Sequence, residues 1–467
     1  MDRTFTDEQI REVIAAAVTA ATAPLLKRIA ELESEIARLK KDSSTSSKPP
    51  SSDIVKPSPA GGRKRKRRQG GQPGHARHNR LAFTPEEVDR TRTYERDDLG
   101  GEWEPLDEYR IVQQVDLIDD PLEVVEHRAR RYRHRQSGAI LTASLPPGVA
   151  EAGLIGVGLS SLIAYQKGVC HMSYATIQKF LGDVLGLSLS TGQLAKVIQK
   201  ANAALGACHA ELQAALPEQG VLNVDETGHP EGGKRHWTWG FHVPGVTGFT
   251  WFHIDPSRSA EVLERFLGEA FSGVLGCDYY SAYRKFLSDT KGVLQFCWAH
   301  LVRDVKFLTT LPDAVTRRYG EKLLSRIKQL FRVWHSRDGT RTEGWQSRAE
   351  RARRSVLERA RRPPLRKEAQ NIAQRFREHE ACYFTFLRLP GVEPTNNAME
   401  RQLRFVAIDR KITQGTRGEP GRQWCERMWT LAATCRQQGR SAFRFLQDAL
   451  AAHLNDQPCP SLLTSNP

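Results

Sequence analysis

The sequence predicts a multidomain protein in which α+β and α/β regions surround one central sheet. Two short apolar runs each close on an aspartate, Asp225 and Asp278, and aromatic alternation with Gly-rich links lies between them. A long, basic, helical stretch follows the second aspartate. A Ser-rich and then Arg-rich segment near the N-terminus indicates a linker between separate parts. We therefore expect a strand-rich core that is interrupted by an all-α insertion and preceded by smaller regions.

Changes of composition predict the boundaries of these parts. The N-terminal half divides into a helical, leucine-zipper-like segment, a basic disordered linker, a small β-rich region and a helical region of helix-turn-helix type, at 1–41, 42–80, 81–150 and 151–215. The C-terminal half divides into the first part of the core, the α-helical insertion, the C-terminal core helices and a tail, at 216–304, 305–390, 391–455 and 456–467.

Composition and charge restrict the partners of this protein. The 467 residues are 39% hydrophobic, enough for a buried core, and 69 Lys and Arg against 54 Asp and Glu give a net charge of +15. This charge favours a polyanion, and we expect DNA. No apolar run approaches the ~20 residues of a membrane span, and the first residues carry no secretion signal. The eight scattered cysteines are typical of reduced thiols, so we expect a cytoplasmic protein with no membrane partner.

Two features of the N-terminal part indicate assembly and DNA contact. Five apolar residues alternate spacings of four and three, the pattern of a coiled-coil seam: Leu25, Ile29, Leu32, Ile36 and Leu39. We expect a homo-oligomer from this seam, although an amphipathic helix that packs on its own domain has the same pattern. Pro24 should start or interrupt the helix. Six consecutive cations in the linker are expected to bind DNA phosphates rather than form a solvated tail: Arg63, Lys64, Arg65, Lys66, Arg67 and Arg68.

The two regions before the core predict strands and then a helical pair. Alternating patterns predict strands at 109–118 and 122–132. Gly186 separates a helical pattern at 173–185 from another that begins at Ser190 or Thr191, which indicates a helix-turn-helix. A helical hairpin that binds nothing has the same pattern, so both interpretations stay open.

The core begins with three antiparallel strands, a helix and two further strands. The apolar run 221–224 forms the strand before Asp225, residues 259–270 are helical, and 273–278 and 292–296 form the later strands. This order is the opening of an RNase-H-like sheet, in which the first and fourth strands are neighbours. Asp225 and Asp278 should then form a hard-oxygen site suited to Mg²⁺. A carboxylate that ends a strand is more often a turn residue or a cap, so the site needs a third acid.

The third acid is expected on a helix that begins after the insertion. Asn396, Asn397, Glu400 and Arg404 fall on one face of it. The opposite face can pack on a sheet through Met399, Leu403 and Val406. An ordinary solvated face with a Glu–Arg pair is the alternative. Glu400 is preferred because it alone lies on the Asn-Asn face, although four other acids are near it in sequence: Glu393, Asp409, Glu419 and Glu426.

Cys297 and His300 form half of a zinc motif, Cys-Trp-Ala-His. A tetrahedral structural zinc site needs four ligands, and no second pair lies nearby in the sequence. We therefore expect no metal at this motif.

Together these motifs resemble the DDE transposases of the insertion sequence 66 family. The specific elements are Val-Asp-Glu-Thr-Gly at 224–228, Cys-Asp at 277–278, Cys-Trp-Ala-His at 297–300 and Thr-Asn-Asn-Ala-Met-Glu-Arg at 395–401. Lys-Pro-Pro-Ser-Ser-Asp at 48–53 and Gly-Gly-Gln-Pro-Gly-His at 70–75 are similar to the linker of that family. The resemblance extends from about Leu25 to Leu454.

The resemblance implies a site and its cofactors. It places the catalytic and metal-binding roles on Asp225, Asp278 and Glu400, with two Mg²⁺ (or Mn²⁺) ions, in an RNase-H-like core split by the helical insertion. It also implies multimerisation and accessory proteins of the same element. The paired Cys-x-x-Cys motifs of the family are missing before Cys170, so its zinc finger is degenerate here and zinc is not expected.

On this basis we expect Mg²⁺-dependent DNA cleavage and strand transfer at the terminal inverted repeats of a bacterial insertion sequence. Beside the linker cations, the side chains expected to contact element or target DNA are Cys297, His300, Asn396, Asn397, Arg404 and Lys411. Two alternatives stay open. One is a catalytically inactive or regulatory DNA-binding relative, and the other is an RNase-H-like nuclease without strand transfer.

Overall fold

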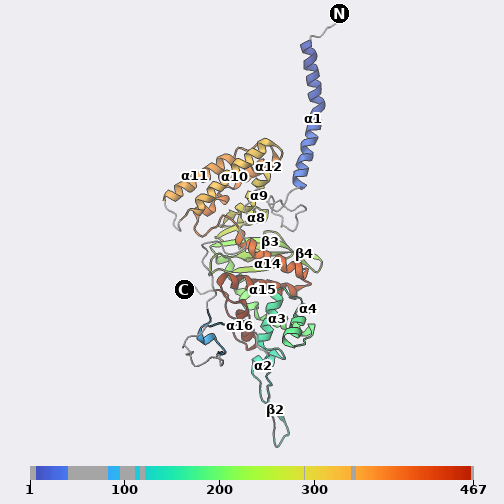
Figure 1. The fold of residues 1–467 in the computed structure, drawn as a ribbon, viewed down its shortest axis with the longest axis vertical. Coiled ribbons are helices and arrows are strands. Elements are labelled where there is room, and N and C mark those ends of the chain that lie inside the picture. Colours follow the sequence, from blue (N-terminus) through green and yellow to red (C-terminus); the bar gives the residue numbers. More distant parts are fainter. Residues whose placement is uncertain are drawn as a thin grey trace, which may run out of the picture. The chain divides into compact units, whose positions relative to one another are not determined.

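The computed structural model describes residues 7–39, 82–94, 111–115, 121–288, 290–337 and 343–463 (Figure 1). The chain divides into two compact units, one made of Met1–Pro57 with Ala129–Pro467 and the other of Ser58–Arg128. The six linker cations at 63–68 lie outside the described residues, so their contact with DNA stays a prediction.

Helix α1 (Asp7–Leu39) begins the described chain and runs without a break through Pro24. The expected interruption at Pro24 is therefore wrong. One proline removes only one hydrogen bond from the ladder, and the rest of this 33-residue helix continues on both sides. The five seam residues are all exposed, between 47% for Leu32 and 66% for Leu39. Self-association through this seam stays a prediction.

The unit Ser58–Arg128 contains little regular structure among its described residues. A single 3₁₀ turn, Pro85–Glu87, is capped by Thr84. The N–H of Phe83 donates to Gln113 Oε1 at 2.7 Å, and Gln113 Nε2 donates to the Phe83 carbonyl at 3.0 Å. The strands expected at 109–118 and 122–132 are wrong for 111–115 and 122–130, which form none. Their valines are exposed, so no buried apolar face is available to stabilise strand pairing.

A two-stranded ribbon supplies the remaining β-structure before the core. Strand β1 (Arg131–Arg133) pairs antiparallel with β2 (Ile140–Thr142), and Tyr132 lies opposite Leu141. Gly138 turns the chain between them with a φ of +68°. Both strands are exposed on both faces, so the described residues between 82 and 150 are poorer in strand and in core than expected.

The helices before the core lie where the sequence places them. They are α2 (Pro147–Ala152), α3 (Val157–Gly168), α4 (Tyr174–Leu185), α5 (Thr191–Ala204) and α6 (Gly206–Ala215). Helix α4 ends at Gly186, which adopts a left-handed conformation with φ +62°. Ser190 caps α5 by accepting from the N–H of Gln193 at 3.2 Å. The helix–glycine–helix pattern is thus confirmed as structure, whereas its contact with DNA stays a prediction.

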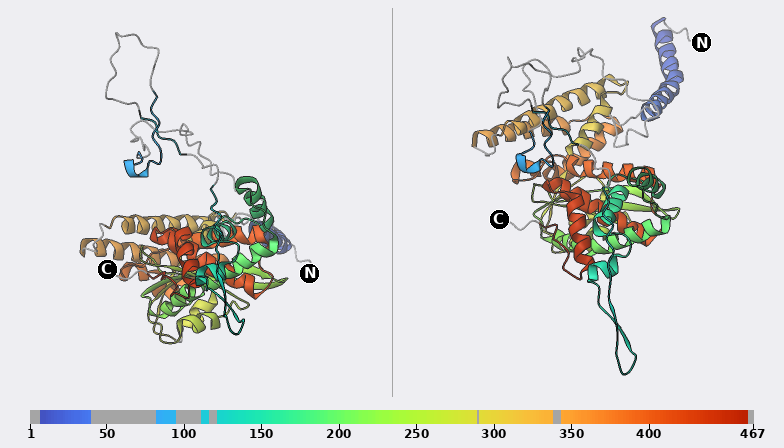
Figure 2. Two further views of the ribbon diagram at one scale, coloured as in Figure 1. Left: turned by 90° about the horizontal axis from the view of Figure 1, so that it is seen from below. Right: turned by 60° about the horizontal axis from the view of Figure 1, so that its bottom comes forward.

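The central sheet has five strands in the order β5-β4-β3-β6-β7. Figures 1 and 2 draw these strands in the green to yellow part of the colour scale. They are β3 (Val221–Glu231), β4 (Lys234–His242), β5 (Thr250–Asp255), β6 (Val274–Cys277) and β7 (Val293–Phe296). Strands β3, β4 and β5 are antiparallel, and β6 pairs parallel with both β3 and β7. The predicted neighbourhood of the first and fourth strands is confirmed. Strand β3 was expected to end at Asp225, and this expectation is wrong. Pairing with β4 extends the strand to Glu231.

Helices cover both faces of this sheet. On one face lie α7 (Glu261–Leu267) and α8 (Ser281–Ser288), and the Phe266 ring of α7 is 4.8 Å from the Trp251 ring of β5. On the other lie α14 (Asn397–Thr413) and α15 (Glu419–Gln438). A Cβ at Gly240 of β4 would lie 2.1 Å from Met399 Cε, so the glycine leaves the space that the Met399 side chain of α14 fills. Met399, Leu403 and Val406 are buried, as predicted.

Helix α15 also protects the edge strand β5. Three of its side chains, one turn apart, accept hydrogen bonds from alternate β5 N–H groups: Glu426 from Ile254 at 2.7 Å, Thr430 from Phe252 at 3.0 Å and Thr434 from Thr250 at 3.1 Å. Four helical residues rise about 6 Å, and two strand residues span about 6.6 Å. The spacing of the α15 side chains therefore matches the spacing of alternate β5 N–H groups. These N–H groups are occupied, so they cannot pair with a further strand.

The expected insertion is mainly helical in its described residues, with short turns between the helices. It consists of α10 (Ala314–His335), α11 (Glu343–Ala360), α12 (Lys367–Tyr383) and α13 (Thr385–Arg388), and follows α9 (Trp298–Leu308). Helix α16 (Ala442–Leu454) packs against α3 and α5. None of the helices in the described ranges is both long and apolar enough to cross a bilayer. All eight cysteines are free thiols.

Candidate active site

Two carboxylates lie where the parallel pairing of β3 with β6 stops, because β6 ends there while β3 continues. The pairing of β3 with β6 stops at Asn223, two residues before Asp225, and Asp278 directly follows β6. Backbone N–H groups orient both side chains: Glu226 donates to Asp225 Oδ1 at 2.9 Å, and Tyr280 donates to Asp278 Oδ1 at 2.8 Å. The two aspartates therefore follow the paired parts of adjacent strands, and their joint role in one site stays a prediction.

The first turn of α14 brings Glu400 to the same part of the sheet. Asn396 is the N-cap residue, but its side chain does not cap the helix. Instead, Asn396 Nδ2 donates to the Val224 carbonyl at 2.8 Å, next to Asp225 in the chain, and its backbone N–H donates to Cys297 Sγ at 3.2 Å. These two bonds attach the start of α14 to β3 and to the start of α9. Asn396 is therefore a positioning residue for Glu400 rather than a surface group.

The acids act on each other electrostatically. Burial raises the pKa of Asp225 well above its usual value, and the negative charges of Glu226, Asp278 and Glu400 raise that pKa further. Glu400 Oε1 is buried and accepts no hydrogen bond in the described part of the chain. Clustered carboxylate oxygens with unused lone pairs suit a hard divalent cation such as Mg²⁺. The chemistry of these residues thus suits the metal that the sequence predicts, and its binding there stays a prediction.

A fourth acid, Glu226, lies beside the cluster and was missed by sequence reasoning. Arg258 Nε donates to Glu226 Oε1 at 2.8 Å, and the Tyr283 hydroxyl donates to Oε2. Burial and the charge of Asp278 raise the pKa of Glu226, while Tyr283 and Arg258 oppose the rise. Both oxygens of Glu226 already have partners, unlike Glu400 Oε1. Its position next to Asp225 in the sequence was the available signal.

The guanidinium of Arg258 stacks on two aromatic rings beside the acids. Its guanidinium lies 4.5 Å from the Trp237 ring centre and 4.0 Å from that of Tyr280. The Arg258 side chain is 35% exposed, so it presents a fixed cation at the rim of the acid cluster. A guanidinium fixed in this way is suited to a phosphate oxygen. No sequence pattern marks this residue, because its loop is placed by tertiary packing alone.

The four rival acids are all bound elsewhere. Glu393 is exposed, whereas Asp409 and Glu426 are buried in hydrogen-bond networks on the α14–α15 side of the sheet. The partners are Arg337 for Glu393, Trp429 for Asp409, Gln423 for Glu419 and the backbone of Ile254 for Glu426. None of these acids is among the charges that shift the pKa of Asp225. The geometry therefore favours Glu400 as the third acid.

Cys297 and His300 lie against Glu400. This proximity was not predicted from the sequence. His300 Nδ1 is 3.7 Å from Glu400 Oε1, and Arg303 approaches Glu400 Oε2 at 3.4 Å. Burial lowers the pKa of His300, although Glu400 opposes the shift. Burial also raises the pKa of Cys297 to about 11. The expectation that no further ligand lies near the Cys-x-x-His motif thus overlooked Glu400.

The other predicted DNA contacts on α14 differ in exposure. Asn397, Arg404 and Lys411 are exposed, whereas Asn396 is buried. Exposure leaves Arg404 and Lys411 able to meet a phosphate backbone, but it does not single them out from other surface cations. Their role stays a prediction.

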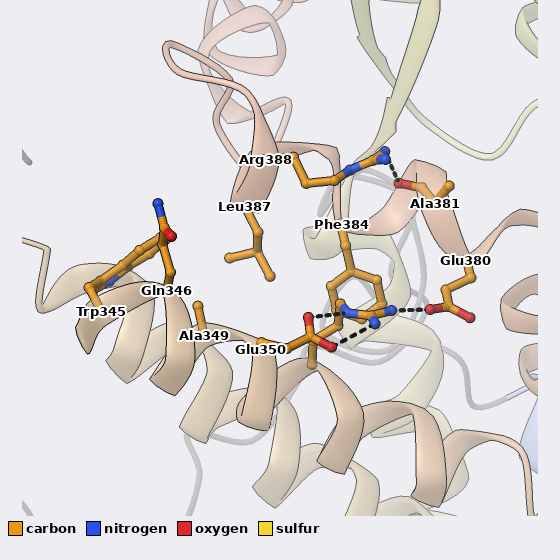
Figure 3. Close-up of a pocket in the computed structure, with 10 residues that line it drawn as sticks. Trp345, Gln346, Ala349, Glu350, Glu380, Ala381, Phe384, Leu387 and Arg388 are labelled. Carbon is orange, nitrogen blue, oxygen red and sulfur yellow. Dashed lines mark hydrogen bonds and ion pairs between the residues drawn. The ribbon is translucent and has the colours of Figure 1, made fainter. Parts of the chain in front are cut away.

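A cavity of ≈ 580 Å³ lies within the helical insertion, apart from the acid cluster (Figure 3). Aromatic and aliphatic groups of Trp345, Phe384 and Leu387 line it, and Arg353 at its side contacts Glu380 and donates to Glu350 at 2.7 Å. None of the predicted site residues lines this cavity. The candidate active site is therefore the acid cluster at the sheet and not this cavity.

Comparison with known proteins supports the same region. A family model described as "Transposase IS66 family" matches residues 152–423, which include the three acids, Cys297 and His300. A second model, described as a family of unknown function (DUF6444), matches residues 3–81. The chain is 25% identical over 375 residues to the uncharacterized protein y4qI of Sinorhizobium fredii, an alignment that covers 72% of this chain and 67% of that protein.

Proposed function

The chain belongs to the IS66 transposase family, whose model matches more than half of it, and on that premise we propose that it is a DDE transposase. The proposed reaction is Mg²⁺-dependent cleavage of DNA at the ends of an insertion sequence, followed by joining of those ends to target DNA. The observation that carries this proposal is the convergence of Asp225, Asp278 and Glu400, whose charges act on one another at a single edge of the sheet.

The strand order supports an RNase-H-like core. Three antiparallel strands are followed by a helix and by two parallel strands, with β3 and β6 adjacent. This arrangement places Asp225, within β3, near the carboxyl end of β6. A helix that arrives after the insertion, α14, then supplies the third carboxylate at that point.

Asp225, Asp278 and Glu400 would hold the metal ions through their carboxylate oxygens. When bound, Mg²⁺ supplies a charge that activates a water or a DNA 3′-hydroxyl and stabilises the leaving oxygen. Asn396 keeps Glu400 in place by fastening α14 to Val224. Phosphodiester transfer on this scheme forms no covalent bond between DNA and protein.

Cations around the acids would bind the DNA backbone. Arg258 presents its stacked guanidinium at the rim of the site, and Arg404 and Lys411 are exposed on α14. These charges balance the repulsion between phosphate and the acids. Neutral His300, whose pKa is lowered by burial, could orient a phosphate or a base near Glu400. The linker cations at 63–68 and the α4–α5 pair would add contacts farther along the DNA.

The test uses purified full-length protein and labelled DNA that carries an element end. With Mg²⁺, we expect a free 3′-hydroxyl at the element end and a slower-migrating product in which that end is joined to target DNA. Asp225→Asn should abolish both products. Cleavage without joining would support a nuclease, and binding without cleavage in wild-type protein would support a regulatory relative. Products that persist in Asp225→Asn would contradict the proposal.

A further inference from the structure

A sulfur, an imidazole and a carboxylate converge where α9 and α14 begin. Cys297 Sγ, a ring nitrogen of His300 and a carboxylate oxygen of Glu400 all lie within 4.8 Å of one another. Cys297 is the N-cap residue of α9, His300 comes from the first turn of that helix, and Glu400 comes from the first turn of α14. Thiolate, imidazole and carboxylate are the three ligand types of protein zinc sites.

Two of the three ligand atoms lack a hydrogen-bond partner among the described residues. His300 Nδ1 and Glu400 Oε1 are both buried and face each other at 3.7 Å, beyond hydrogen-bonding distance. Buried polar atoms rarely stay without a partner. A tetrahedral zinc with bonds of roughly 2.0–2.2 Å to nitrogen and oxygen would hold these two atoms about 3.3–3.6 Å apart. The observed 3.7 Å is only slightly wider than this spacing, so a small shift of either side chain would let one cation bridge the two atoms.

Neighbouring groups hold the ligands in this arrangement. Arg303 lies 3.4 Å from the other oxygen of Glu400, Oε2, which leaves Oε1 directed at His300. The Asn396 N–H donates to Cys297 Sγ at 3.2 Å. Hydrogen bonds of this kind orient metal ligands and favour the thiolate, which is the form of sulfur that binds metal.

We propose that Cys297, His300 and Glu400 bind one thiophilic divalent cation, for which Zn²⁺ fits the ligand set, with a fourth position for water. The Cys297 thiol releases its proton to solvent as the sulfur–metal bond forms. The expectation of no zinc rested on ligands close in sequence, and Glu400 is distant in sequence.

The consequence for catalysis rests on the proposed function. Glu400 bound to Zn²⁺ is withheld from the site of Asp225 and Asp278. Sulfur and nitrogen ligands select zinc, whereas Mg²⁺ prefers oxygen alone. Zinc should therefore inhibit the Mg²⁺-dependent reaction, and added Mg²⁺ should relieve that inhibition only partly.

Metal binding can be measured without DNA. Metal-free full-length protein is titrated with Co²⁺, which gives a near-ultraviolet band when bound to thiolate and visible bands in tetrahedral geometry. We expect a plateau at one Co²⁺ per chain and loss of the bands when Zn²⁺ is added. A wild-type protein that shows no cobalt–thiolate band would overturn the proposal.

Variants then locate the site. Cys297→Ser keeps the size of the side chain and an acceptor for the Asn396 N–H, and it should lose the band and weaken Zn²⁺ binding by about 100-fold, the share of one ligand. His300→Gln should weaken binding comparably. Cys435→Ser, at a buried thiol that belongs to no such ligand group in the described ranges, should leave the titration unchanged. Circular dichroism checks folding, and a band that survives in both Cys297→Ser and His300→Gln would contradict the assignment.

The two proposals fail separately. If wild-type protein joins DNA but shows no cobalt–thiolate band, the zinc site is contradicted and the transposase proposal is unaffected. Conversely, wild-type protein could show a cobalt–thiolate band that Cys297→Ser loses, yet never cleave element ends. That result would support the metal site and contradict the proposed reaction.

Discussion

Asp225 is the residue whose chemistry depends most on its neighbours. Burial and the charges of Glu226, Asp278 and Glu400 raise its pKa, so between the unfolded and folded pKa values the folded chain binds more protons than the unfolded chain. The free energy of unfolding of the metal-free protein therefore falls as pH rises through that range. Bound Mg²⁺ should offset this loss, because a cation stabilises the ionised carboxylates.

Asp225→Asn should raise the melting temperature of metal-free protein near neutral pH, because it removes one charge from the cluster. The same variant should lose the stabilisation by Mg²⁺, which in wild-type protein is about 2.7 kcal/mol at 100 times the dissociation constant. Differential scanning calorimetry with and without Mg²⁺ measures both effects.

Asp255→Asn is the matched control for this prediction. Burial alone would raise the pKa of Asp255, but the Ser257 N–H and Arg265 hold it below its usual value. Its loss should lower the melting temperature and leave the Mg²⁺ effect intact. An unchanged Mg²⁺ shift in Asp225→Asn would place the ion elsewhere.

Single residues were predictable from the sequence only where they lay on a periodic element. Asp225, Asp278 and Glu400 follow recognisable strand and helix patterns, so their meeting could be expected. Arg258 and Tyr283 lie on a loop and on α8, and only the folded sheet brings them to Glu226. The third ligand of the Cys-x-x-His motif was missed for the same reason.

At the scale of elements, the contact between α15 and β5 depends on three hydrogen-bond acceptors of α15, two hydroxyls and one carboxylate. Thr430→Val keeps the shape of the side chain but leaves the Phe252 N–H without its acceptor, and this should cost about 1–3 kcal/mol of stability. Urea unfolding gives the difference. Thr430→Ser retains the hydroxyl and should lose much less. Equal losses in the two variants would assign the effect to packing.

Helix α1 is the element expected to join chains. Leu32→Lys with Ile36→Lys would place two charges in the exposed apolar row, and we expect a smaller sedimenting species. Ala20→Lys with Ala23→Lys adds the same charge to α1 outside that row and should leave the assembly unchanged. If the first pair sediments like wild-type protein, the seam does not mediate self-association.

The elements also show where pattern reasoning failed. Strands were expected at 109–118 and 122–132 because alternation alone was counted, but strands need a partner and a covered face. The described valines there have neither, whereas the shorter strands β6 and β7 are largely buried, with β6 paired between β3 and β7. The continuation of β3 beyond Asp225 was missed because its partner β4 determines its length.

For the whole molecule, the net charge of +15 predicts DNA binding that weakens steeply with salt. Deletion of residues 63–68 should reduce the slope of log K against log salt by up to about five, at roughly 0.9 per phosphate contact. A variant with lysine at all six positions keeps the charge and should keep the slope. A slope that the deletion leaves unaltered would mean that the run does not contact DNA.

The central claim, that three acids from β3, β6 and α14 form one catalytic site, is tested most directly at Glu400. Purified Glu400→Gln and Glu393→Gln proteins are compared with wild type for Mg²⁺-dependent joining of element ends. The first substitution removes a charge from the cluster, and the second removes one from an exposed pair with Arg337. We predict that Glu400→Gln loses joining by several orders of magnitude and still binds the same DNA, while Glu393→Gln joins normally. Robust joining by Glu400→Gln would contradict the claim.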